Sequence, residues 1–225
     1  MKIFPVIHYL DAGLALDQLD LAKEEGADGA FLISHDGRDD EMIGVALQAK
    51  RGLGDFALGI NLLSKKPWFA CEVAKQFDLD MVWADRMGVD SSGLDSSGLA
   101  LSGFAEIHPR IQLFASVAFK YQAIEKDPAL AAQNAWKAGF IPTTSGNATG
   151  VAPHLSKIAD MSVACQGSLA VASGITPENA IHYRDLVSCA LVSTGISSDG
   201  YRLNRQKLRA LLVVARSHEP ALAPI

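Results

Sequence analysis

The sequence predicts a (β/α)₈ barrel, also called a TIM barrel, as a single domain over residues 1–225. Eight short apolar runs recur along the chain, each followed by helical or loop sequence. The runs are continuous rather than alternating, which is typical of parallel strands whose outer face is covered by helices. The length also suits one barrel, which usually takes about 200–250 residues. An open doubly wound sheet is the alternative, but it usually has fewer strands.

In chain order, we expect the strands at residues 3–7, 29–33, 57–62, 81–84, 111–118, 139–142, 169–172 and 190–192. Capping signals mark the helices between them. A helix over residues 14–25 ends at Gly26, a favourable C-cap residue. Acidic, asparagine or proline signals predict further helix starts at residues 39–41, 67, 127–128, 176–177 and 204.

The connection after the fourth strand is unusually long. Residues 86–109 are rich in Gly and Ser and contain Asp-Ser-Ser-Gly-Leu twice in succession, at residues 90–94 and 95–99. We expect a loop with a short helix near residues 101–107. Long connections are often functional or mobile, so a lid over the site and an inert flexible loop both stay open.

Composition excludes several classes of function. The net charge of −5 with no basic run predicts no nucleic-acid binding, and no apolar stretch is long enough for membrane insertion. Pro5 and His8 interrupt the N-terminal apolar run, so no secretory signal is expected. Three widely spaced cysteines predict buried, reduced thiols and a cytoplasmic protein without a structural metal. No cofactor is predicted, and assembly into a homo-oligomer is left open.

Candidate catalytic residues stand where strands end, because barrel active sites lie at the carboxyl ends of the strands. We select His8, His35, Asp85 and Lys120. Asp85 as a base and Lys120 as the stabiliser of a developing oxyanion would divide the chemistry, although a salt bridge at the rim is an equal alternative. His8 could instead be a core histidine, and His35 a solvated loop residue beside Asp36. The remaining histidines, His108, His154, His182 and His218, are expected on the surface.

Three loops rich in Gly, Ser and Thr follow the last three predicted strands. Glycines let backbone N–H groups approach an anion, and hydroxyls add donors. Because barrels often bind phosphate with the loops after strands seven and eight, these loops predict a phosphorylated small-molecule ligand. The ligand-binding candidates are Ser145, Gly146, Thr149, Ser173, Gly174, Thr194 and Gly195, together with Asn61 at the end of the third strand.

The same loops resemble a known family. Residues 144–150 read Thr-Ser-Gly-Asn-Ala-Thr-Gly, residues 172–179 read Ala-Ser-Gly-Ile-Thr-Pro-Glu-Asn, and residues 192–200 form the last strand and loop. All three stretches are similar to BtpA-type proteins, with the match extending over residues 140–212. The resemblance implies the fold of the ribulose-phosphate-binding barrels. One departure concerns charge, since Ser197 stands where the family usually has lysine.

Two classes of function follow from these observations. The first is an enzyme that binds a phosphorylated sugar or nucleotide-like metabolite and acts as a lyase, isomerase or nucleosidase by general acid–base chemistry. The second is a noncatalytic, BtpA-like assembly or biogenesis factor. Polar residues at several strand ends favour the enzyme, whereas the missing lysine favours the binder.

Overall fold

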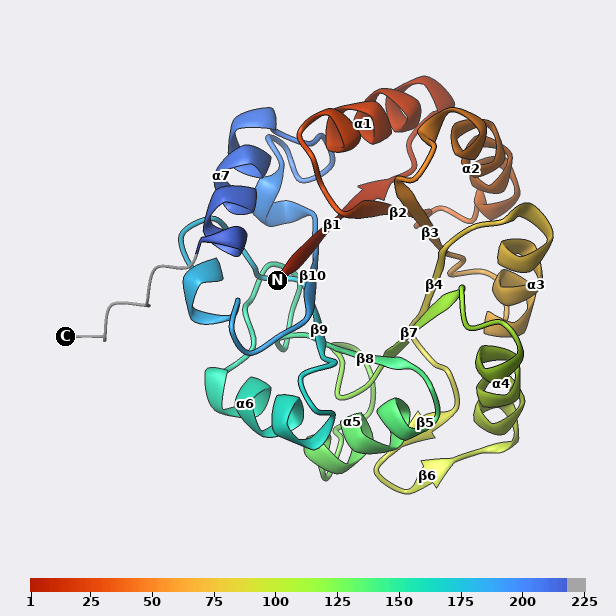
Figure 1. Cartoon of the computed structure of the whole chain (residues 1–225), viewed down its shortest axis with the longest axis vertical. Helices are drawn as coiled ribbons and strands as arrows, with labels where there is room; N and C mark the ends of the chain where they lie inside the picture. Colours follow the sequence, from red (N-terminus) through yellow and green to blue (C-terminus); the bar gives the residue numbers. More distant parts are fainter. Residues whose placement is uncertain (218–225) are drawn as a thin grey trace.

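Eight parallel strands close into a barrel in the computed structural model, which describes residues 1–217. The order around the barrel is β1-β10-β9-β8-β7-β4-β3-β2, so the first strand pairs with the last (Figure 1). All eight predicted strands are confirmed, and the eighth-strand closure excludes the open sheet. Two strands differ notably from their predicted bounds: β7 ends two residues earlier, and β8 starts and ends two residues later. The strands are β1 (Lys2–His8), β2 (Gly29–Ile33), β3 (Ala57–Asn61), β4 (Met81–Ala84), β7 (Gln112–Ser116), β8 (Ile141–Thr144), β9 (Ala170–Ala172) and β10 (Cys189–Val192).

Helices surround the barrel as a ring (Figure 1). They are α1 (Ala12–Glu24), α2 (Asp39–Leu53), α3 (Pro67–Phe77), α4 (Ser96–Ile107), α5 (Pro128–Lys137), α6 (Leu155–Ala164) and α7 (Arg205–Arg216). Four predicted starts are confirmed. Asp39 and Pro67 open their helices, while the side chains of Asp127 and Asn204 accept N-capping hydrogen bonds.

The helix predicted to start at Thr176-Pro177 is wrong, because only a short 3₁₀ turn, η1 (Ala180–His182), follows β9. The cause is local competition from the side chain of Asn179. Its Oδ1 accepts from the backbone N–H of Thr176 at 2.8 Å, and its Nδ2 donates to the carbonyl oxygen of Gly174 at 2.8 Å. These bonds offer the backbone an alternative to a helical ladder.

Residues 86–109 contain more regular structure than the sequence predicted. A small antiparallel hairpin of β5 (Val89–Asp90) and β6 (Gly93–Leu94) comes first, and α4 then starts five residues before the expected helix. Asp95 caps α4 by accepting from the N–H groups of Ser97 and Gly98. The two identical five-residue units therefore adopt different structures, because the second supplies an N-cap. The hairpin packs on α5 at the edge of the barrel, and the lid function stays a prediction.

Two apolar layers hold the fold together. One lies between the strands and the helices, and the other fills the barrel interior. Phe31 contacts Phe4, Trp83 and Phe114 edge-to-face, with ring centroids 5.1–6.1 Å apart. The indole N–H of Trp83 donates to the hydroxyl of Ser116 at 2.9 Å. The interior is therefore a packed aromatic core rather than a channel, and any ligand must bind above it.

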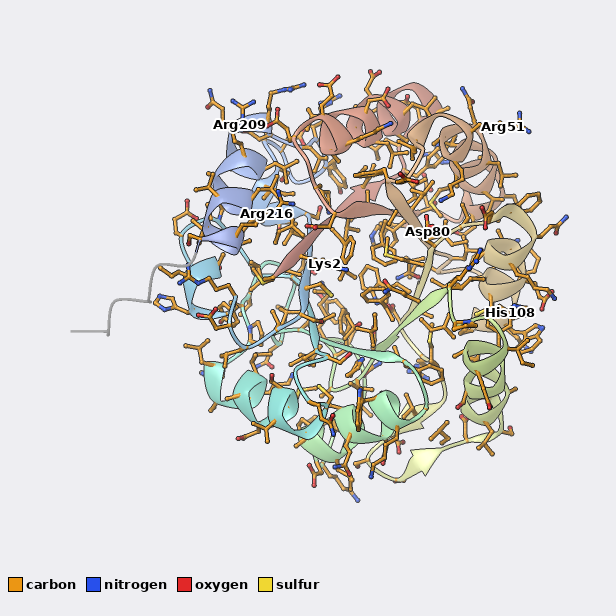
Figure 2. All side chains as sticks on the ribbon, in the orientation of Figure 1. Lys2, Arg51, Asp80, His108, Arg209 and Arg216 are labelled. Carbon is orange, nitrogen blue, oxygen red and sulfur yellow. The ribbon has the colours of Figure 1, made fainter. Side chains whose placement is uncertain are left out.

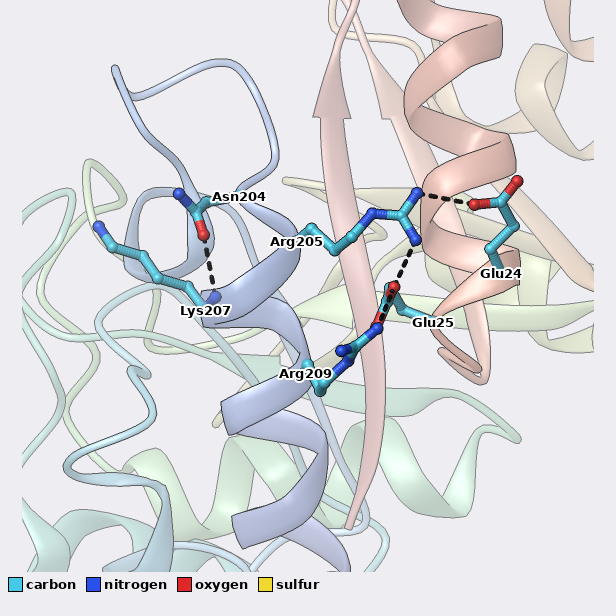
Figure 3. Close-up of polar contacts among 6 residues, drawn as sticks. All are labelled: Glu24, Glu25, Asn204, Arg205, Lys207 and Arg209. Atoms are coloured by element: carbon cyan, nitrogen blue, oxygen red, sulfur yellow. Dashed lines mark hydrogen bonds and ion pairs between the residues drawn. The ribbon is translucent and has the colours of Figure 1, made fainter.

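Ion pairs join the first and last helices on the outside of the barrel, at the seam where β1 pairs with β10. Arg205 donates to Glu24 and Glu25, and Arg209 makes two further bonds to Glu25 at 2.8 and 3.0 Å (Figure 3). The side chain of Glu25 is only 3% exposed under these guanidinium groups. Arg209 projects from the outer edge of the helical ring, as Arg51 does elsewhere (Figure 2). The pairs therefore support the seam without reaching the barrel mouth.

The three cysteines, Cys71, Cys165 and Cys189, are buried and unpaired as predicted. Burial raises the pKa of these thiols to about 12, 11 and 12, respectively. Across residues 1–217, the structure has no helix whose length and apolar character would suit a membrane crossing.

We predict that Gly59→Ala destabilises the protein by about 1–3 kcal/mol, the usual cost of overpacking a core. A Cβ at this position would lie 2.4 Å from the ring of Phe31 and 2.8 Å from the Cβ of Met81. Gly44→Ala is the matched control, since a Cβ there meets nothing within 4 Å and should stabilise α2 by about 0.5–1 kcal/mol. Urea unfolding measures both. Equal effects of the two substitutions would contradict the packed interior.

Candidate functional site

A polar layer caps the aromatic core at the carboxyl ends of the strands. Successive side chains of a strand point to opposite faces, so residues two apart share a face. His8 follows the interior residue Val6 by two positions, and Asp85 follows Trp83 in the same way. Ser193 likewise follows Leu191. The alternation that buries the core thus carries polar side chains to the mouth.

One cavity of about 300 Å³ gathers all four candidate catalytic residues, His8, His35, Asp85 and Lys120. Its apolar wall includes Trp83, the upper layer of the core. Three of the predicted ligand-binding residues also line it: Thr149, Ser173 and Thr194. The other five do not: Asn61, Ser145, Gly146, Gly174 and Gly195.

His8 is held at the junction of the first and last strands. Its Nε2 lies 3.0 Å from the hydroxyl oxygen of Ser193, a hydrogen bond between residues 185 positions apart. The His35 ring stacks on it at 5.0 Å, and the Tyr201 ring meets it edge-on at 5.6 Å. Burial, with smaller effects from His35 and Lys120, lowers the pKa of His8 to about 4. The imidazole is therefore neutral at pH 7.

Asp85 and Lys120 face the same cavity, but no ion pair within 4.0 Å joins them in the described part of the chain. The cavity walls desolvate the Asp85 carboxyl and raise its pKa, against the opposing effects of Asn61 and Lys120. Asp85 stays open to solvent at the mouth, and water limits this rise. Burial lowers the pKa of Lys120. Each shift moves a charged group toward its neutral form, which suits proton transfer.

A strained turn presents Lys120 to the cavity. Ala118 and Tyr121, on either side of it, have φ angles of 47° and 65°, in the left-handed region that non-glycine residues rarely adopt. Neighbouring loops hold the turn. The backbone N–H of Lys120 donates to the hydroxyl of Ser145 at 2.8 Å. The ammonium of the half-buried Lys157 donates to the carbonyl oxygens of Ala118 and Ser145 at 2.7 and 2.9 Å. Ser145 thus positions Lys120 rather than facing the cavity.

The three Gly/Ser/Thr loops lie against one another at the cavity's rim. The hydroxyl oxygen of Ser173 accepts from the N–H of Gly150 at 2.9 Å, and Ser173 itself has a φ of 91°. A Cβ on Gly174 would come within 2.3 Å of the backbone nitrogen of Ala152. A Cβ added to Gly146 would lie 2.2 Å from the carbonyl oxygen of Val151, and one added to Gly195 would lie 2.0 Å from the carbonyl oxygen of Ile175. The glycines therefore let the loops interlock, while hydroxyls reach the cavity.

Comparisons with known proteins agree with this architecture. Phosphoribosyl anthranilate isomerase from Thermotoga maritima is 16% identical, with a TM-score of 0.69 over 96% of this chain and 99% of that one. The isomerase from Thermus thermophilus is 15% identical, with a TM-score of 0.68 over 95% and 98%. A native KDPGal structure is 15% identical, with a TM-score of 0.68 over 96% and 95%. At these identities the likeness shows the TIM-barrel fold alone. No family model and no curated protein matches the sequence.

Other polar residues considered from the sequence do not line this cavity. Asn61 is 1% exposed beneath the cavity, and its Nδ2 has no hydrogen-bond partner in residues 1–217. Asp36 bonds to Arg38 and Ser34 rather than to His35, which lowers its pKa to about 2. His154 and His182 are exposed as predicted, His108 is half-buried, and His218 lies outside the described residues. Within residues 1–217, no three His, Cys, Asp or Glu side chains are grouped to hold a metal ion.

Three residues of the site were not singled out from the sequence: Ser193, Lys157 and Tyr201. Ser193 carried a usable signal, because it continues the inward alternation of β10 by one step. Lys157 lies on α6, and Tyr201 lies in the connection before α7. Neither position marks a residue as close to the mouth, so these two had no comparable signal.

We predict that stability falls as the pH drops from 6.5 toward about 4, in part through His8. In this window the unfolded chain binds a proton at residue 8 that the folded protein does not, so the free energy of unfolding rises with pH. His8→Gln should flatten this slope in urea titrations, whereas His182→Gln, at an exposed site, should not. Parallel curves for wild type and His8→Gln would contradict the lowered pKa.

Proposed function

We propose that the protein is a cytoplasmic TIM-barrel enzyme that binds a phosphorylated sugar or nucleotide-like metabolite and acts on it by general acid–base chemistry. Isomerase, lyase and nucleosidase reactions all fit this proposal. The observation that carries it is the convergence of His8, Asp85 and Lys120 on one cavity at the carboxyl ends of the strands. Three unpaired, buried cysteines agree with a reducing compartment.

The hydroxyl-rich side of the cavity suits the phosphate of such a ligand. Thr149, Ser173 and Thr194 come from the loops after the last three strands. The ammonium of Lys120 lies 3.3 Å from the hydroxyl of Thr149 and supplies positive charge. Ser173 keeps a strained backbone, a feature that clusters at ligand-binding sites. The phosphoribosyl anthranilate named in two of the structural neighbours is itself a phosphorylated compound.

Asp85, Lys120 and His8, which line the same cavity, suit proton transfer. A carboxylate whose pKa is raised above its usual value is a better general base than a fully solvated one. Asp85 would remove a proton, and Lys120 would stabilise the oxyanion that develops on the substrate. His8, which is neutral at pH 7, offers a hydrogen bond without adding charge.

A noncatalytic binding protein is the second candidate. The resemblance of residues 140–212 to BtpA-type proteins favours it, together with Ser197 at the position of the family's lysine. Ser197 is buried, and its carbonyl oxygen accepts from the ammonium of Lys207 on α7 at 2.9 Å. An assembly factor of this kind would bind the same ligand without turning it over, which separates the two candidates.

For a phosphorylated sugar that the wild type converts, Asp85→Asn and Lys120→Met should each lower kcat by about 10²-fold or more, the usual size of a general acid–base contribution. Steady-state kinetics measure this loss. Both substitutions keep the size of the side chain while removing the charge that the mechanism uses.

Asp20→Asn and Lys66→Met serve as matched controls, because both side chains are exposed away from the cavity. They should leave kcat within twofold of wild type. If Asp85→Asn and Lys120→Met also stay within a few-fold, the pair is structural and the acid–base proposal fails. Ligand binding without turnover by the wild type would favour the noncatalytic candidate.

A further inference from the structure

The hydrogen bond between His8 and Ser193 has a direction that geometry alone leaves open. The His8 Nε2 and the Ser193 oxygen lie 3.0 Å apart, and either atom could donate, depending on the imidazole tautomer. The other ring nitrogen, Nδ1, is fully buried and has no hydrogen-bond partner in residues 1–217. This unpartnered nitrogen decides which tautomer costs less.

A neutral imidazole carries one N–H group. If that proton were on Nδ1, a donor would be buried without an acceptor, which folded proteins rarely tolerate. With the proton on Nε2, the N–H donates to Ser193, and Nδ1 leaves only a lone pair unpaired. Unpaired acceptors are more common than orphaned N–H groups, so the Nε2–H tautomer is favoured.

The Tyr201 ring forms a T-shaped pair with His8, with ring centroids 5.6 Å apart, and offers Nδ1–H a competing partner. An Nδ1–H directed at its π-face would gain a weak N–H···π contact. Such a contact is worth less than the N–H···O bond to Ser193, so the ring does not reverse the preference. Burial, with smaller effects from His35 and Lys120, lowers the pKa of His8 and keeps a second proton off the ring.

We propose that Ser193 is a ligand-binding residue whose hydroxyl donates to an acceptor oxygen of the ligand. Because the Ser193 oxygen accepts from His8, its O–H is not used in that bond, and no other acceptor contacts it in the part of the chain that the structure describes. Ser193 is half-buried and lines the cavity. His8 acts as the positioning residue that fixes this polarity, so the cavity selects a carbonyl, carboxylate or phosphate oxygen over a hydroxyl hydrogen at this point.

The tautomer can be tested without any ligand. Long-range ¹H–¹⁵N correlation spectra of the ¹⁵N-labelled protein at pH 7 distinguish the two neutral forms, and His8→Gln assigns the signals. We expect the Nε2–H form in the wild type and a shift toward Nδ1–H in Ser193→Ala, which removes the acceptor. A wild-type Nδ1–H form, or a doubly protonated ring, would overturn the inference. Tyr201→Leu should leave the wild-type tautomer unchanged.

The ligand half of the inference rests on the proposed function and has its own test. Calorimetric titration with ribose 5-phosphate should give a Kd about tenfold or more weaker for Ser193→Ala, since a hydrogen bond to a charged oxygen is lost. Ser193→Thr keeps the hydroxyl and should bind within threefold, as should Ser156→Ala on an exposed part of α6. Unchanged binding by Ser193→Ala would refute the role of Ser193 while leaving the proposed function standing. No binding by the wild type would count against the proposed function itself, and the ligand half would fall with it.

Discussion

Pairing of β1 with both β10 and β2 closes the barrel and sets the position of every element around it. This strand pairs on both sides, residues 2–5 with β10 and residues 6–8 with β2. The split register brings the end of the first strand to the end of the last, which places His8 beside Ser193. Without closure, these two residues, 185 positions apart in the chain, would not meet in space. The ion pairs of Glu25 with Arg205 and Arg209 brace the same seam from outside.

The aromatic interior gives the site its chemistry as well as its floor. Because Phe31, Phe114 and Trp83 fill the barrel, water reaches the polar layer only from above. Partial desolvation then lowers the pKa of His8 and Lys120 and raises the pKa of Asp85. Each change favours the neutral form of the group. The same burial that stabilises the fold therefore weakens the charged form of each of these groups.

Much of this architecture could be predicted from the sequence, because parallel strands covered by helices leave continuous apolar runs that are easy to recognise. Strand ends then predicted that His8, Asp85 and Lys120 share a cavity. The sequence pattern mispredicted helix starts where hydrogen bonds from one side chain decided the local backbone structure. Asn179 replaced a helix by a turn, and Asp95 started a helix where a loop was expected. The bond between His8 and Ser193 and the brace from Lys157 depend on tertiary contacts that no local pattern contains.

We propose that the closed barrel presents a phosphate-selective site, and a thermal-shift comparison of phosphorylated sugars with their dephosphorylated counterparts is the experiment that tests this proposal. A ligand that binds only the folded state stabilises it by about 2.7 kcal/mol at 100 times its Kd, enough to raise the Tm by several degrees. We expect such a rise for at least one phosphorylated sugar, a much smaller one for its dephosphorylated form, and loss of the rise in Lys120→Met. Equal shifts for both forms, or no shift with any phosphorylated sugar, would contradict it.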